Sequence, residues 1–502
     1  MLGSPGGWSS QACSLSLGVN GRREVGAMLW DSNALLAFFL NASAALLVFA
    51  LIARISLAEP GLLLLNFLFC FVCSWRLISV LYLDIFGPIA SEQLERSIGP
   101  GLASVPLGAC QILVFLMLLA SFHPQRLKAL AVTSNFRMLN VLPAGRFDFF
   151  NLVFWIVLLF EVALWIEMLR GGTIPIISKI ERLDYSRELG GFLHGRLMDW
   201  GPMLAFQLGL FFGAPVLRGA RFDYRFAALF GGLMFYLLFV GHRFSSFFLY
   251  FSFFIMPLGC ILLGRSKAAA FDHSAFFRML RALWLPVAGL AALVLGALIY
   301  SYAVVRAGES ESLEAKLTQR LLVQQGEMWW MTYERVFLHG DWNARRAFFR
   351  LFVDPFNPNR NSTMQLLMEL GLPTERAHDL FNWGIAYAGG WPEVLFELSG
   401  PINGFLLAAI SAILFAEFLF LLTRCVVEER YVTCFFLTPI LYAIEINFAS
   451  GMMNSFIQLT FMTKLAAAIF VYVLEDRWRA WMTASISPRV DQATVLEKEV
   501  MP

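Results

Sequence analysis

Long runs of apolar residues, each of the length that crosses a bilayer, recur along nearly the whole chain. About 20 helical residues cross roughly 30 Å of hydrocarbon, and a helix satisfies its own backbone groups there. The pattern therefore predicts an all-α fold, a polytopic transmembrane helix bundle with about eleven spans. The predicted spans are residues 34–53, 61–83, 103–122, 149–169, 200–217, 226–241, 247–263, 283–302, 402–423, 431–448 and 455–474, the fifth to seventh being short.

Between the eighth and ninth runs lies a polar stretch of about a hundred residues. The chain is accordingly divided into an N-terminal tail, helices 1–8, a large loop, helices 9–11 and a C-terminal tail. These parts are residues 1–33, 34–302, 303–401, 402–474 and 475–502. Residues 1–27 are Gly/Ser-rich and end in GRREVGAM, the pattern of a translated ribosome-binding sequence, so we expect Met28 to be the biological start.

Composition agrees with a membrane protein. Of 502 residues, 58% are hydrophobic and 15% charged, against about a quarter charged in soluble domains. The net charge of +2 gives no reason to expect nucleic acid as a partner. The large loop contains no cysteine, so no disulfide holds it. Cys70 and Cys73 form a CxxC inside an apolar run, where two packed small residues are a better interpretation than a redox site.

Lys and Arg in the short loops predict the orientation, because positive loops stay in the cytoplasm. Residues 123–148, 218–225 and 264–281 carry such clusters and are predicted to be cytoplasmic. The C-terminus then lies inside and the large loop, which has more acidic than basic residues, lies outside. The outer segments are predicted to be residues 84–102, 170–199, 242–246, 303–401 and 449–454.

Ionisable residues inside predicted spans are candidates for a functional site, since each costs about 3 kcal/mol or more unless paired or hydrated. They are Arg76, Glu161, Glu167, Arg243, Glu417, Glu445 and Lys464. Most fall in the outer half, Lys464 near the middle and Glu417 toward the cytoplasm. Structural ion pairs between helices are the alternative for each residue. Their convergence under the large loop favours a site.

Arg243 is the strongest of these candidates. The motif GHRFSS places it in a turn between two short predicted spans, with His242 beside it. A guanidinium in such a turn presents a fork of donors to an anion at the outer membrane surface.

The large loop contains two stretches with amphipathic helical patterns. Residues 311–337 include Trp329 and Trp330, and tryptophan is the residue type that settles at the bilayer interface. Residues 342–352 set three arginines opposite three phenylalanines, so we expect this helix to lie on the membrane and bind phosphate. The arginines are Arg345, Arg346 and Arg350. A solvated helix that covers the bundle is the alternative.

The end of the loop, from Tyr387 to Phe405, is YAGGWPEVLFELSGPINGF and leads into the ninth span. Its glycines permit tight turns and close backbone approach. Glu393 and Glu397 are four residues apart and would share one helical face at the membrane rim. With His378, they are candidates for a general base; a helix cap or an exposed acid is the alternative.

These features resemble a family. The short outer turn with an arginine, the large late loop and its ending in GGW, Glu and a Gly–Gly pair are similar to the Wzy-type O-antigen and oligosaccharide repeat-unit polymerases. Those belong to the GT-C-like membrane glycosyltransferases. The segment from Gly171 to Gly190 also looks like an outer loop of that family.

The resemblance implies transfer of a glycan chain from undecaprenyl pyrophosphate to a second lipid-linked repeat unit, at the periplasmic face of the bacterial inner membrane. The implied partners are these lipid-linked substrates, membrane lipid and a chain-length regulator protein. Positive charge on the departing pyrophosphate and a base on the acceptor hydroxyl would suffice, so we expect neither cofactor nor metal.

The residues expected to act fall into two sets. The catalytic set is Arg243, His378, Glu393 and Glu397. The set expected to bind substrate or pyrophosphate is Arg76, His242, Arg306, Arg320, Arg345, Arg346, Arg350, Glu445 and Lys464.

Other functions remain alternatives. A lipid-linked oligosaccharide flippase would also need buried basic residues, although its loops would be short. An O-antigen ligase is a close enzymatic rival. An acyltransferase would need a buried histidine in a span, and none of the six histidines lies clearly inside a predicted span. A transferase using a polyprenyl phosphate sugar would need an acidic pair in the first outer loop, where Asp84, Glu92 and Glu95 are unpaired.

Overall fold

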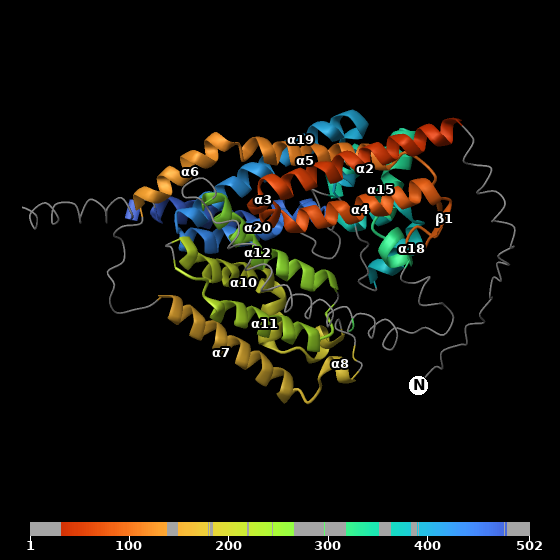
Figure 1. Cartoon of the computed structure of the whole chain (residues 1–502). Coiled ribbons are helices and arrows are strands. Elements are labelled where there is room, and N and C mark those ends of the chain that lie inside the picture. Colours follow the sequence, from red (N-terminus) through yellow and green to blue (C-terminus); the bar gives the residue numbers. More distant parts are fainter. Residues whose placement is uncertain are drawn as a thin grey trace, which may run out of the picture.

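The computed structural model of the chain is a bundle of helices (Figure 1). It describes residues 32–137, 149–178, 180, 184–217, 220–242, 244–265, 296, 318–350, 363–382, 389, 391–475 and 477–478. Predicted span 283–302 therefore lies outside the described residues, apart from Gly296, as do Arg243 and Arg306.

Eight helices in the described part of the chain are long and apolar enough to cross a membrane. They are α2 (Ser32–Ala58), α4 (Phe67–Phe86), α5 (Ser104–Ser121), α7 (Phe149–Arg170), α10 (Phe192–Leu217), α12 (Phe244–Arg265), α19 (Glu393–Val427) and α20 (Tyr431–Ser450). Helix α11 (Tyr224–Phe239) is apolar but shorter, and residues 459–475 are also helical. An all-α polytopic membrane protein is thus confirmed, while the count of eleven spans stays a prediction.

Two of the predicted spans differ from the helices of the structure. The second span is split by Asn66 into α3 (Pro60–Leu65) and α4. The fifth span is not short, because α10 has 26 residues and begins at Phe192. Polar residues in the first turns of α10 hid the start of the fifth helix from a search for apolar runs. The ninth span agrees with the prediction, because non-helical backbone at Gly400 divides α19 and the helix that follows the kink begins at Pro401, one residue before the predicted start at 402.

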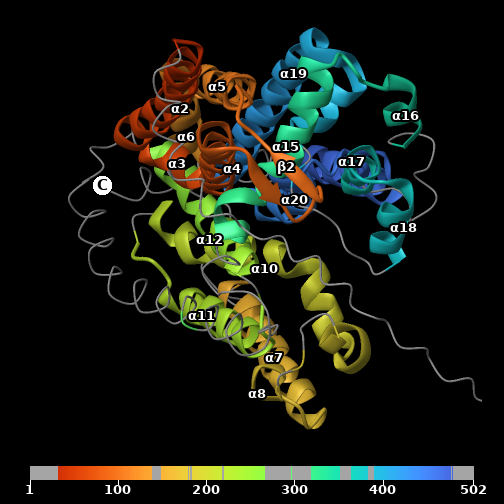
Figure 2. The ribbon, with the colours of Figure 1, turned by 90° about the vertical axis from the view of Figure 1, so that its right-hand side faces the viewer.

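Close helix packing forms the centre of the bundle. Helix α10 packs along α12, α12 along α3, and α5 along α19 and α2. Contact between α10 and α12 requires Gly209, since a Cβ there would lie 1.8 Å from the backbone oxygen of Phe254. Helices α7 and α11 lie at one edge of the bundle, away from α2, α5 and α19 (Figure 2).

The connections gather at the two ends of the bundle (Figure 1). Helix α6 (Pro124–Arg137), from a predicted cytoplasmic loop, is at one end. At the other end lie α8 (Pro175–Ser178), α15 (Glu327–Thr332), α18 (Thr374–Asn382) and a hairpin of β1 (Ile89–Ser91) with β2 (Arg96–Ile98). All four come from segments predicted to be outside, so the predicted grouping agrees with the fold. Which end faces the cytoplasm stays a prediction.

The small antiparallel hairpin is an addition to the predicted all-α fold. Ile89 pairs with Ile98 and Ser91 with Arg96. Asp84, near the end of α4 and just before the hairpin, ties this connection to the start of α5. Its carboxylate accepts the backbone N–H groups of Ala103 (3.1 Å) and Ser104 (2.7 Å), at the start of α5.

The segment 318–350 folds back onto this end as η4 (Gln319–Val323), α15, η5 (Tyr333–Leu338) and α16 (Ala344–Phe348). Trp329 and Trp330 were expected at the bilayer interface, and this expectation was wrong because both are buried. Their indole N–H groups donate to the carbonyl of Ala103 (2.6 Å) and to Asp84 (3.1 Å). An amphipathic tryptophan pair fits a polar-edged protein interior as well as a membrane interface.

Candidate functional site

The first part of the site is an ion pair between α4 and the first residue of α19. The Arg76 guanidinium donates to the Glu393 carboxylate and to the carbonyl of Trp391, and the Arg76 and Glu393 side chains are 4% and 0% exposed. Burying a charge requires such a partner. Nε of Arg76 and Oε2 of Glu393 have no hydrogen-bond partner in the described part of the chain. The pair can therefore form further hydrogen bonds, one from Nε of Arg76 and one to Oε2 of Glu393.

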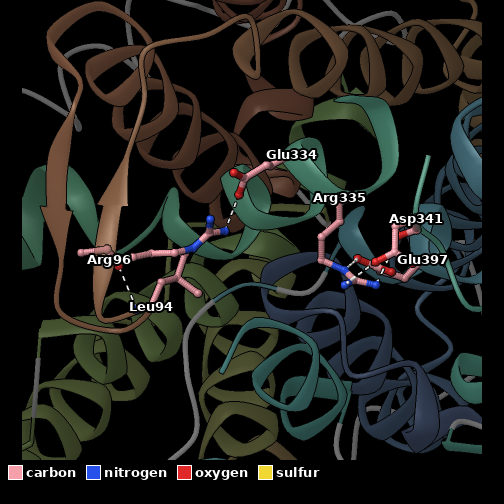
Figure 3. A network of polar contacts seen from close by, with 7 residues as sticks. Leu94, Arg96, Glu334, Arg335, Asp341 and Glu397 are labelled. Carbon is pink, nitrogen blue, oxygen red and sulfur yellow. Dashed lines mark hydrogen bonds and ion pairs between the residues drawn. The ribbon is translucent and has the colours of Figure 1, made fainter. Parts of the chain in front are cut away.

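A second pair lies one helical turn along α19. Nε of Arg335, in η5, is 3.4 Å from Oε1 of Glu397, which is 1% exposed. The other nitrogens of Arg335 contact the carboxylate of Asp341 (2.8 Å) and its backbone carbonyl (3.2 Å). Figure 3 shows Arg335 pointing at both acids, with the neighbouring Arg96–Glu334 pair on the hairpin side.

The second pair leads from the buried interior to the surface. Arg335 is 20% exposed and Asp341 is 61% exposed, whereas Glu397 is buried. Oε2 of Glu397 has no hydrogen-bond partner among the described residues. An anion that drew the guanidinium of Arg335 away would free the carboxylate of Glu397.

Glu445 of α20 adds a third buried carboxylate. It is 1% exposed, and neither of its oxygens has a hydrogen-bond partner in the described ranges. Cys73 of α4 lies within electrostatic range of both Arg76 and Glu445, which places them in one region of the bundle. Burying a carboxylate at membrane depth without a partner costs free energy, and acids retained at such positions are typically functional.

Aromatic rings and glycines close the region around α19. The centroid of the Trp391 ring lies 4.8 Å from that of Phe448 on α20 and 6.3 Å from that of Phe69 on α4. Gly400 has a φ of +80°, and a Cβ there would lie 2.9 Å from the ring of Trp342. The glycine therefore permits both the kink and the close approach of the segment carrying Arg335.

The structure brings together three of the predicted side chains with Arg76. Glu393 and Glu397 share a face of α19 as predicted, but both are buried in ion pairs, so neither is the exposed acid of the alternative interpretation. Arg335 and Asp341 were missed. Their only signal is proximity in space, because Arg335 is 62 residues from Glu397 in the chain.

Several predicted residues do not join this cluster. Arg346 and Arg350 both pair with Glu369 of α17 (Thr363–Gly371), so one carboxylate is shared by two guanidinium groups, and phosphate binding by this helix stays a prediction. Arg345 is exposed and lies over the ring of Phe349. The predicted helix over 342–352 begins as the short α16, whose Ala347 is buried.

The remaining predicted positions are dispersed. Lys464 is exposed on the helix of residues 459–475, so it does not converge with the other charges. His378 is exposed on α18, and Arg320 is hydrogen-bonded to Gln324. His242 lies at the turn between α11 and α12. Arg243 and Arg306 lie outside the described residues.

Two further intramembrane acids are explained by local structure. Glu417 pairs with Arg126 of α6 (2.7 Å), at the end opposite to Glu397. Glu167 of α7 accepts the backbone N–H groups of Leu193 (3.1 Å) and His194 (2.9 Å) and so caps α10. A carboxylate is favourable at a helix N-terminus.

Burial also affects an acid in the segment above the cluster. Glu327 of α15 is fully buried, and burial raises its pKa from 4.5 to about 7. Its Oε1 accepts a hydrogen bond from Gln319 (3.0 Å). Among the described residues no three His, Cys, Asp or Glu side chains lie close enough to hold a metal ion, and metal independence stays a prediction.

Chemically, the cluster offers guanidinium groups beside carboxylates with free oxygens. Such a set can bind an anionic group and accept a proton from a hydroxyl. Residues 357–465, which include Glu393, Glu397 and Glu445, match a family of unknown function, DUF6418. No curated protein and no solved structure matches the chain.

Proposed function

We propose that the protein is a membrane glycosyltransferase that joins lipid-linked oligosaccharide repeat units into a surface polysaccharide. The observation that carries this proposal is the paired Arg335–Glu397, a cation and a buried base in contact at the loop-bearing end of the bundle. A glycosyl pyrophosphate needs charge neutralisation and a base, and this pair supplies one group of each kind.

The proposed reaction assigns a role to each group. The acceptor hydroxyl attacks the anomeric carbon of the donor glycan, and the bond from that carbon to the pyrophosphate oxygen breaks. The pyrophosphate leaves with the electron pair and is stabilised by Arg335 and by Arg243, for which the sequence predicts this role. The hydroxyl proton goes to Glu397. Binding of pyrophosphate by Arg335 would release Glu397 from its ion pair, so the base becomes available when the donor is bound.

The Arg76–Glu393 pair would position Glu397, the proposed base, on α19. Glu393 and Glu397 lie in the first two turns of α19, and fixing Glu393 against α4 fixes the orientation of both. Arg76 lies beneath Trp391 and is buried, so we assign it to positioning rather than to contact with pyrophosphate.

Deletion of the gene in its host tests the proposal. The surface polysaccharide is then separated on a gel. A polymerase predicts single repeat units with no ladder, while a full ladder that remains on its lipid indicates a ligase. An unchanged polysaccharide contradicts all of these functions.

A flippase for lipid-linked oligosaccharide is a second candidate, and one observation favours it. Glu445 of α20 and Glu161 of α7 are buried acids with unpartnered oxygens among the described residues. Intramembrane acids of this kind occur in proton-coupled transporters. In the deletion strain, lipid-linked units trapped on the cytoplasmic side of the membrane would support this function over the polymerase.

A further inference from the structure

A second polar cluster lies at the same end of the bundle, between α7, α10 and α11. His194 in the first turn of α10 is 1% exposed. No histidine lies clearly inside a predicted span, but His194 lies in an apolar helix of membrane-crossing length, because α10 begins eight residues before the predicted span. A buried imidazole in a polar network is a common form of catalytic base.

Both ring nitrogens of His194 are engaged. Nε2 lies 3.0 Å from Oγ of Ser186, and Nδ1 lies 3.1 Å from the phenol oxygen of Tyr236. Ser186 is exposed, while Tyr236 is buried and is also hydrogen-bonded to Tyr185. With the proton on Nδ1 donated to Tyr236, Nε2 is left to accept the hydroxyl proton of Ser186.

The surrounding backbone is built around this arrangement. Ser186 belongs to the π-helix η2 (Tyr185–Leu189), a distortion that frequently occurs at functional sites. A Cβ on Gly190 would lie 2.7 Å from the imidazole of His194, and one on Gly191 would lie 2.2 Å from the carboxylate of Glu167. Glycines at these two positions therefore let the imidazole of His194 and the carboxylate of Glu167 lie against the backbone of residues 190 and 191. Glu167, which accepts the backbone N–H of His194, also acts electrostatically on its imidazole and favours the protonated ring.

Exposed apolar side chains lie close to Ser186 in the chain and at the end of the neighbouring helix α7. Leu189 and Phe192, on either side of the two glycines, are 45% and 70% exposed, and Leu169 at the end of α7 is 61% exposed. Phe192 begins α10 and Leu169 lies at the end of α7, two helices long and apolar enough to cross a membrane, and we expect the ends of such helices to lie where lipid headgroups meet acyl chains. Ester carbonyls of lipids lie at that boundary.

We propose that Ser186, His194 and Tyr236 form a catalytic site in which Ser186 takes an acyl group from a lipid carboxylic ester. Oγ of Ser186 attacks the ester carbonyl while Nε2 of His194 takes its proton. The alcohol leaves with that proton, and the acyl group remains on Ser186. Attack by water or a sugar hydroxyl then transfers the acyl group, and its proton returns through His194 to Oγ. Tyr236 holds the imidazole in the required tautomer.

The test uses the full-length protein in detergent, with a fluorophosphonate probe and mass spectrometry of the labelled peptide. We expect a covalent adduct on Ser186 and none in Ser186→Ala. His194→Gln should lower the labelling rate roughly 100-fold or more. Ser178→Ala is the matched control, since Ser178 is an exposed serine at the end of α8, in the same segment, and should leave labelling unchanged.

A second variant keeps the test decisive if Ser186→Ala does not fold. In Ser186→Cys the imidazole should activate the thiol, so iodoacetamide should modify residue 186 faster than in Ser186→Cys combined with His194→Gln. Equal rates in these two variants, or monodisperse wild-type protein that the fluorophosphonate does not label at Ser186, would overturn the proposal. Neither measurement depends on glycan polymerisation, so the acyl-transfer site can be disproved or supported independently of the proposed function.

Discussion

Arg76 of α4 and Glu393 of α19 form an ion pair in which both side chains are buried. The two residues are 317 positions apart, and their contact joins the first half of the bundle to the helix that carries Glu397. Removing one partner leaves the other as a buried charge, whereas removing both leaves only neutral groups.

We therefore expect Arg76→Gln to lower the free energy of unfolding by about 3–5 kcal/mol. The double variant Arg76→Gln, Glu393→Gln should recover most of this loss because Glu393 is then uncharged. Unfolding in detergent, followed by circular dichroism in a double-mutant cycle, measures both. If the single variant is as stable as wild type, the pair does not hold α4 to α19.

Glu397 provides the sharpest test of the proposed base. Glu397→Gln keeps the shape of the side chain but cannot take a proton, so the polysaccharide ladder should disappear at normal protein level. Glu417→Gln is the matched control, since Glu417 also lies on α19 and is paired with an arginine, Arg126 of α6, at the opposite end of the bundle. Loss of the ladder in both variants, or in neither, would show that Glu397 has no special role.

Glu445 separates function from stability in another way. Its carboxylate is buried without a hydrogen-bond partner among the described residues, so neutralisation should not destabilise the fold. Glu445→Gln is expected to unfold at the same temperature as wild type or higher and to produce no ladder. A variant with an unchanged ladder would assign Glu445 to neither catalysis nor transport.

The raised pKa of Glu327 predicts a pH dependence of stability. The folded protein binds a proton at Glu327 up to about pH 7, whereas the unfolded chain releases it near pH 4.5. The contribution of the protonated acid is therefore complete below about pH 4.5 and is lost as the pH rises to about 7, a change of about 3 kcal/mol.

Glu327→Gln removes this titration. We expect the variant and wild type to have similar unfolding midpoints at pH 5, and the variant to be the more stable at pH 8. Melting curves in one detergent across this range measure the difference. Parallel pH profiles for the two proteins would mean that the Glu327 carboxyl titrates alike in the folded and unfolded states.

Asp84 links the hairpin end of α4 to the segment above the site. Trp330→Phe keeps an aromatic ring but removes the indole donor to Asp84. Since that carboxylate retains the two backbone donors at the start of α5, we expect a loss of about 1–3 kcal/mol in the free energy of unfolding. Trp342→Phe, at an exposed tryptophan of the same segment, is the control and should cost less.

The sequence by itself determined the membrane class and most of the spans, because the length of an apolar run reflects the thickness of the hydrocarbon that it must cross. It also determined that Glu393 and Glu397 share a face, since four residues make one turn of a helix. The placing of outer segments at one end followed from alternation of the spans. Each of these properties is local or follows from counting.

Only the tertiary structure decided which groups meet. Trp329 and Trp330 have a pattern that suits either a membrane surface or a protein interior, and the choice depended on Asp84 and Ala103 as hydrogen-bond partners. Packing between helices that are distant in the chain brings Arg76 into contact with Glu393, and Arg335 into contact with Glu397. Periodicity fixes the face on which a side chain lies, but the neighbour of that face is set by the fold.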